Sequence, residues 1–290
     1  MYHLKRNDTA IRTVQLEAKA IGQALQILRD SSEGLVFEAG SHTYSLAGQV
    51  LPSVSDVVHY FAPFDTEKKA AAAAKNPKHP LYGNTAEQII KIWEAKRDAA
   101  ADAGTAVHAF AEACCSYMLG RDDEIESQFR CRLTGEGLLA ITPKEEAVAK
   151  WWSLTDWSRY AIVAKETRVV NAVDRYAGTF DLLLYDRLNS SPGQPWYSLR
   201  DYKTNEDLHR WFGDYLQPPL NMIKSNDIGK YTLQQNLYAI QCENIGIHIG
   251  DMQLIWLKED SDFEEVALDT RYQKVIRTQA LRQYNNRNKI

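Results

Sequence analysis

The sequence predicts an α/β protein, and three observations lead to that prediction. Two apolar runs of strand length, at 178–185 and 197–203, flank a polar connection rich in Asn, Ser, Gly and Pro, which is typical of an antiparallel hairpin. Stretches with apolar residues at helical spacing precede and follow this hairpin. The chain has 290 residues, of which 44% are hydrophobic, so it can bury a sizeable core.

Charge is nearly balanced, with 34 basic and 38 acidic residues and a net charge of −4. No overall basic field therefore indicates a nucleic-acid partner. Basic residues without acidic neighbours do occupy 271–290, and four lysines lie between 68 and 78. Either group could contact phosphates, although a solvated helix face explains each at least as well.

The cysteine spacing and the hydropathy of the chain indicate where in the cell the protein is expected. The four cysteines show no C-x-x-C spacing, so we interpret them as reduced thiols. Neither the apolar core of a signal peptide nor an apolar run of membrane-spanning length is found. We therefore expect a cytoplasmic protein that does not enter a membrane.

The elements expected before the hairpin follow from local signals. They are an amphipathic helix at 14–28, a small hairpin at 35–50 and a helix–loop–helix at 65–103. Gly104 can end the last of these helices, and Thr105 can cap the next, over 106–119.

A capping box with Pro at the first helical position starts another helix at Thr142. The run 161–170 reads as a strand that contains Glu166. After the hairpin, the aromatic residues of 206–226 could stack on nucleic-acid bases, although packing within the protein is the more economical interpretation. The final elements are strands at 252–257 and 263–268 and a basic helix near the C-terminus.

A helix expected at 230–240 carries two stripes. Leu233, Leu237 and Ile240 form an apolar stripe that should face the core. The second stripe is polar and aromatic, and it consists of Tyr231, Gln234, Gln235 and Tyr238. Such a stripe suits a helix that lines a wet cleft.

The hairpin carries acids that an apolar strand pattern does not favour. Asp181 interrupts its first strand, and a turn centred near Ser191 would place Asp181 across from Asp201, with β-carbons roughly 5 Å apart. Lys203 lies two residues beyond Asp201, so both side chains share one face. Two converging carboxylates and an ammonium suit Mg²⁺ or Mn²⁺ and a phosphate. An Asp in a turn beside an exposed Asp–Lys pair explains these three residues about equally well.

His108 falls in the first turn of its expected helix, and Glu112 lies one turn later on the same face. A lone histidine near a helix start is more often a packing residue than a ligand. The sequence motif that contains His108 favours a ligand role instead. The chain resembles the RecB-like branch of the PD-(D/E)XK nuclease superfamily, whose motifs it carries in order: Gly-Thr-Ala-Val-His at 104–108, Gly-Thr-Phe-Asp at 178–181, Asp-Tyr-Lys at 201–203 and Gln-Gln-Asn-Leu-Tyr at 234–238.

The resemblance implies roles for individual residues. His108, Asp181 and Asp201 would ligate one or two divalent ions, Mg²⁺ or Mn²⁺, with the Tyr202 carbonyl and Glu166 as further candidates. Asp181, Asp201 and Lys203 would be catalytic, and Lys203 would stabilise charge on the attacked phosphate. Gln234 and Tyr238 would hold the hairpin or contact the DNA backbone, and Thr105 and Glu112 would support the site.

The resemblance also implies a fold: a restriction-endonuclease-like core with a mixed central sheet flanked by helices. We expect this core at 104–290, including the basic C-terminal helix. An N-terminal helical and hairpin extension at 1–103 would pack on it. Members of the branch with an iron–sulfur cluster flank the core with four cysteines, and this chain has no C-terminal cysteine cluster. We therefore expect no iron–sulfur cluster.

The expected function is hydrolysis of DNA phosphodiesters, most simply by an exonuclease of DNA recombination, repair or phage DNA processing. A single-strand-annealing or recombination protein is a candidate partner. A structure-specific or restriction-type endonuclease could use the same core. A catalytically inactive nucleic-acid-binding module is the alternative from another class, although such a module has no reason to keep facing carboxylates near phosphates.

Overall fold

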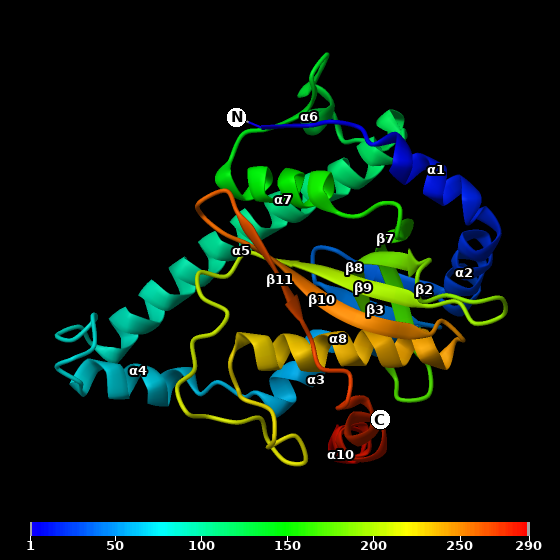
Figure 1. Ribbon diagram of the computed structural model, residues 1–290. Coiled ribbons are helices and arrows are strands. Elements are labelled where there is room, and N and C mark those ends of the chain that lie inside the picture. The colour runs from blue at the N-terminus through cyan, green and yellow to red at the C-terminus, as the bar shows by residue number, and fades with distance from the viewer. Residues whose placement is uncertain (1, 289–290) are drawn as a thin grey trace.

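A mixed five-stranded sheet forms the centre of the computed structural model, which describes residues 2–288 (Figure 1). Its strand order is β11-β10-β9-β8-β7. β9 and β10 are parallel, and the other neighbouring pairs are antiparallel. The strands are β7 (Tyr160–Asn171), β8 (Tyr176–Asp186), β9 (Tyr197–Lys203), β10 (Ile249–Leu257) and β11 (Phe263–Ala267). The α/β class and the hairpin are confirmed.

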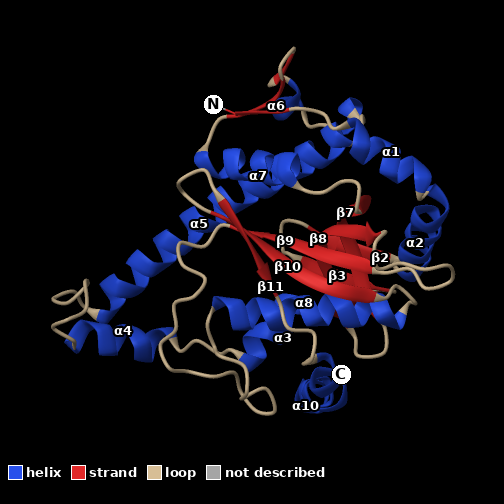
Figure 2. Ribbon diagram, in the orientation of Figure 1, coloured by secondary structure: helices blue, strands red, loops and turns tan. Residues whose placement is uncertain are grey.

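Helices cover both faces of this sheet (Figure 2). Parallel neighbours need a crossover, and α8 (Asp227–Asn244) supplies it between β9 and β10. It packs on one face with α3 (Val54–Phe61), while α7 (Pro143–Leu154) and the end of α5 (Ala86–Met118) cover the other. The capping box predicted at Thr142 is present and begins α7.

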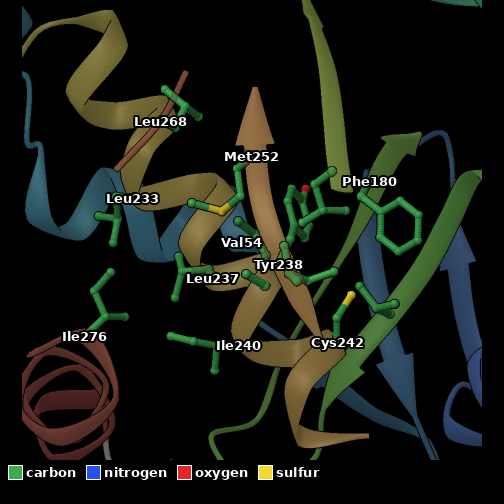
Figure 3. Packing of buried hydrophobic residues seen from close by; sticks show 14 of the residues in the cluster. Val54, Phe180, Leu233, Leu237, Tyr238, Ile240, Cys242, Met252, Leu268 and Ile276 are labelled. Atoms are coloured by element: carbon green, nitrogen blue, oxygen red, sulfur yellow. The ribbon is translucent and has the colours of Figure 1, made fainter. Parts of the chain in front are cut away.

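The two faces of the sheet bury separate apolar cores. The core beneath α8 contains Leu233, Leu237 and Ile240 together with Met252 of β10 (Figure 3), so the predicted apolar stripe of α8 is confirmed. The opposite core is built around three tryptophans, Trp151, Trp152 and Trp157. Because both faces are covered, a charged side chain on a central strand must find its partners inside the protein.

The N-terminal part packs on this core through several small elements. The predicted hairpin near 35–50 is confirmed as a three-stranded sheet of β2 (Leu35–Glu38), β3 (Thr43–Leu46) and β4 (Gln49–Leu51). β1 (Tyr2–Leu4) pairs with β6 (Gly137–Ala140), and β6 also pairs with β5 (Leu133–Thr134). The single helix predicted at 14–28 is instead two helices, α1 (Asp8–Leu16) and α2 (Ala18–Ser31).

One long helix replaces the two helices expected around Gly104. α5 runs without a break from Ala86 to Met118 and projects from the body beside α4 (Thr66–Lys75) as an arm (Figure 1). Thr105 is not a cap, because its hydroxyl donates to the Ala101 carbonyl one turn earlier. A single glycine costs a helix only about 1 kcal/mol relative to alanine, and the flanking alanines compensate. The helix thus crosses the domain boundary expected at 103/104, and that division stays a prediction.

The C-terminal segment is helical, as predicted. It comprises α9 (Gln273–Val275), a π-helical segment (Ile276–Ala280) and α10 (Leu281–Asn288). Lys289, part of the predicted basic tail, lies outside the described residues. The remaining short elements are a 3₁₀ turn (Asp122–Glu124) and α6 (Ser127–Arg130). Within residues 2–288, no helix is long and apolar enough to cross a membrane.

Candidate metal centre

Three carboxylates occupy facing positions on three neighbouring strands. β7 pairs Lys165 with Leu182 and Thr167 with Phe180, so Glu166 lies across from Asp181. β8 pairs Leu182 with Arg200, and the next position of that register sets Asp181 across from Asp201, as the hairpin pattern predicts. Like charges at facing positions destabilise a sheet unless something offsets them.

α5 brings His108 to the same place. Its Nδ1 lies 3.3 Å from Asp181 Oδ2, and its Nε2 lies 3.0 Å from the Tyr202 carbonyl oxygen. The Tyr202 backbone N–H donates to the same Asp181 oxygen at 2.9 Å. Asp181 is therefore held between the helix and β9, which fixes its carboxylate with little freedom to rotate.

Glu166 reaches this group through an unusual backbone conformation. Its φ is +41°, in the left-handed region where a residue with a β-carbon is strained by about 1–3 kcal/mol. Such strain persists only where the surrounding structure enforces it. Burial and the neighbouring carboxylates, Asp181 first among them, raise the pKa of Glu166 to about 9.

Lys203 forms an ion pair with the buried Asp201, beside His108, Glu166 and Asp181. The ammonium contacts Asp201 Oδ2 and lies 4.5 Å above the ring of Tyr231 from α8. Burial and Asp181 raise the pKa of Asp201 to about 6, although Lys203 acts in the opposite direction. Burial alone would lower the pKa of Lys203, but the carboxylate of Asp201, the Tyr231 hydroxyl and Asp181 together raise it above its ordinary value. Lys203 is thus held as a cation.

A glycine explains how the helix α8 packs against the hairpin of β8 and β9. A β-carbon on Gly178 would lie 2.7 Å from Tyr238 Cε1 and 2.8 Å from Val54 Cγ2. Only a residue without a side chain lets the Tyr238 ring pack there. Gln234 lies beside the Tyr238 hydroxyl. Because Tyr238 is buried, its place fits a role in holding the hairpin better than contact with DNA.

The second stripe of α8 matches the expected wet cleft only in part, since Tyr231 is half-buried and lines a cleft. Gln235 and Tyr238 are both buried, so that prediction is wrong for them. Thr105 is exposed and donates within its own helix, and no hydrogen bond within residues 2–288 joins it to the site. Glu112 does line the small cavity that His108, Glu166 and Asp181 share, and burial raises the pKa of its carboxyl group.

Lys165 is a neighbour of the site that the sequence did not single out. Its ammonium donates to Ser116 Oγ at 2.6 Å and to the Glu112 carbonyl at 3.3 Å, and it lines the same cavity. It brings a positive charge close to Glu112. The only signal for it in the sequence is a charged pair, Lys165-Glu166, inside an apolar strand.

The residues present fit a divalent cation. One ligand atom from each of His108, Glu166 and Asp181 lies within 4.8 Å of the others, and no other group of three such residues does so within residues 2–288. Carboxylate oxygens suit Mg²⁺, and an added imidazole suits Mn²⁺ as well. Asp201 lies outside this group and faces Lys203 instead. The four cysteines are free thiols, and the three in α5 and α8 are buried.

Comparisons with known proteins add little to this geometry. No protein-family model matches the chain, and no curated protein matches its sequence. A crystal structure from Eubacterium rectale named "Putative exonuclease" is similar to it with a TM-score of 0.36 and 13% identity. The match covers 61% of this chain and 64% of that chain, less than two thirds of its length. Similarity this low supports no argument, so function must be argued from the residues of the site.

Proposed function

We propose that this chain is a divalent-metal-dependent nuclease with a PD-(D/E)XK core, which hydrolyses DNA phosphodiesters as an exonuclease of recombination, repair or phage DNA processing. One observation carries the proposal. Three carboxylates on adjacent strands, of which Asp181 and Asp201 are buried and Glu166 is half-buried, meet a histidine from a helix and a charged lysine. Such a cluster is unfavourable for an apo protein and suitable for a site that holds a cation and a phosphate.

The residues divide into two groups by what they can do. His108, Glu166 and Asp181 would hold the cation, with the Tyr202 carbonyl close by. A bound Mg²⁺ or Mn²⁺ supplies Lewis acidity at the phosphate and at water. Asp201 is in contact with Lys203 and is a further carboxylate available to a cation.

Lys203 would act on the phosphate itself. The neighbouring carboxylates keep its ammonium charged, and the contact with Asp201 fixes its direction. A fixed cation stabilises the negative charge that grows on the phosphate oxygens as the bond breaks. Its burial keeps bulk water from screening this interaction.

The test is a time course with Mg²⁺ or Mn²⁺ on one DNA sequence. Linear DNA would be labelled separately at its 5′ and 3′ ends, in single- and double-stranded form, beside the closed circle. An exonuclease should degrade the linear form, spare the circle and release one end label first. A cut circle would identify an endonuclease instead, and no cleavage with either metal would refute the proposal.

A further inference from the structure

A cleft of about 800 Å³ opens directly beyond Lys203. The arm of α4 and α5 forms one wall, and the segment 204–226 together with the start of α8 forms the other. Figure 1 shows this segment passing beside the arm between the end of β9 and the start of α8. Thr204, Asn205 and Tyr231 line its inner end, and Tyr231 is the residue whose ring lies against Lys203. Tyr231 thus contacts both the cleft and the lysine of the proposed catalytic site.

Aromatic rings stand exposed in this cleft. Phe212 is 77% exposed and Phe64 is 63% exposed, and both line it. Trp211 and Tyr215 lie near Phe212 in the segment and are also exposed. Packing within the protein does not account for rings left in water. Exposed rings beside a backbone-binding groove are the means by which proteins stack unpaired bases.

The charge of the cleft is balanced, and this helps to decide whether a duplex or a single strand fits it better. Five lysines and arginines and five carboxylates line it. A duplex presents two dense rows of phosphates and needs a surplus of positive charge along its groove. A single strand also exposes the faces of its bases, so stacking can supply much of its affinity. Exposed rings with balanced charge therefore favour an unpaired strand.

Two ion pairs cross from the arm to the segment. Lys69 lies 3.1 Å from Asp214, and Lys96 lies 3.0 Å from Glu206. All four side chains are at least half exposed, and exposed pairs contribute little to stability. A phosphate can therefore replace either carboxylate at small cost, which turns these lysines into phosphate contacts when a strand enters.

We propose that this cleft binds single-stranded DNA and guides an unpaired end to the catalytic site, with Phe212 and Phe64 stacking on bases. The inference rests on the proposed function, because DNA is named as the ligand on the ground that Lys203 and its neighbours are proposed to hydrolyse it. It adds a substrate class, since a paired end would have to be opened before it could occupy the cleft.

The experiment measures binding without catalysis. Fluorescence anisotropy in EDTA would compare a labelled short oligothymidylate with a duplex of the same length. The proteins would be the parent chain, Phe212→Ala, Phe212→Leu and Phe64→Ala. Leu188→Ala is the matched control, because Leu188 is also highly exposed but lies in the β8–β9 connection outside the cleft.

We expect the parent chain to bind the single strand more tightly than the duplex. Phe212→Ala should weaken single-strand binding roughly 5- to 150-fold, the effect of removing one stacking ring. Phe212→Leu should lose nearly as much affinity, because leucine keeps the apolar area but has no ring to stack on a base. Leu188→Ala should bind like the parent chain. Equal affinity for duplex and single strand, or full affinity in both Phe212 variants, would overturn the inference.

Failure of the inference and failure of the proposed function give different results. If the single strand binds through Phe212 but no DNA is cleaved with either Mg²⁺ or Mn²⁺, the cleft assignment holds and the nuclease proposal is wrong. If DNA is cleaved but the Phe212 variants bind normally, the nuclease proposal holds and the cleft assignment is wrong.

Discussion

Lys203 and Thr204 are consecutive residues, yet they separate two regions of opposite physical character. Up to Lys203, β8 and β9 are buried between two helical layers, and their charged side chains contact one another. From Thr204 to Asn226 the chain forms neither helix nor strand and leaves aromatic rings in solvent. The first region holds the groups to which we assign the chemistry, and the second holds the groups to which we assign DNA binding.

The difference follows from what burial does to each kind of side chain. A buried charge must be paired, so its position is fixed by its partners, and catalysis needs groups held in place. An exposed ring keeps its face free for a ligand. The chain thus keeps the parts that must be rigid within the sheet and the parts that must meet a ligand in the segment that follows.

The largest contrast should appear in stability. Leu183→Ala, at a fully buried position of β8, should lower the free energy of unfolding by about 2–5 kcal/mol because it leaves a cavity. Phe212→Ala should change it by less than ~0.5 kcal/mol because the ring is in solvent. Urea unfolding followed by tryptophan fluorescence measures both. An equal loss in the two variants would mean that the cleft rings stabilise the fold.

A smaller effect is expected on metal binding, which a substitution in the sheet should weaken and a substitution in the segment 204–226 should not. Asp181→Asn should weaken Mn²⁺ binding roughly 10- to 100-fold, a loss seen even for residues that only orient ligands. Phe212→Ala and the exposed control Asp98→Asn should leave it unchanged. Calorimetric titration of the metal-free proteins provides the measurement, and Mn²⁺ affinity that survives Asp181→Asn would remove Asp181 from the ligand set.

The smallest effect concerns Asp186 at the end of β8. Its carboxylate is paired with Arg159, whereas Asp181 lies among other carboxylates. Burial would raise the pKa of Asp186, but hydrogen bonds from Arg159 and Asn189 outweigh it and hold the pKa below its ordinary value. Because this pKa is lower in the folded than in the unfolded chain, its contribution to stability is present above the unfolded pKa and is lost as the pH falls through the folded value.

Asp186→Asn should therefore destabilise the protein by about 1–2 kcal/mol at neutral pH. The difference from the parent chain should shrink as the pH falls below about 4, the ordinary range of an aspartate. Denaturant unfolding at several pH values measures it. A difference that stays constant down to the lowest pH would show that Asp186 does not act through its charge.

The sequence predicts the parts of the site that local patterns control. The positions of Asp181 and Asp201 follow from hairpin register, which a single turn centre sets. The approach of His108 to Asp181 follows from the family resemblance and from no local pattern. Glu166 was a candidate, but its left-handed backbone is imposed by its surroundings, and no local signal encodes it.

Other features depend on tertiary packing and were predicted wrongly or not at all. Gly104 resembles a helix end, yet α5 continues through it. The polar stripe of α8 resembles a cleft wall, yet Tyr238 is buried against Gly178. The aromatics after β9 resemble core residues, yet Phe212 is in solvent. In each case the local pattern is compatible with a buried and an exposed environment, or with a continued and an interrupted helix. Tertiary packing determines which of them occurs.

The most direct measurement is the rate at which the parent chain and Lys203→Met release nucleotides from labelled linear DNA with Mn²⁺. The control is Lys19→Met, at an exposed position of α2. Circular dichroism and Mn²⁺ titration should first show that Lys203→Met is folded and binds metal. The account predicts cleavage by the parent chain and the control, and a loss on the order of 10²–10³-fold or more in Lys203→Met, the usual effect of removing one transition-state contact. Cleavage by Lys203→Met at the parental rate would contradict it.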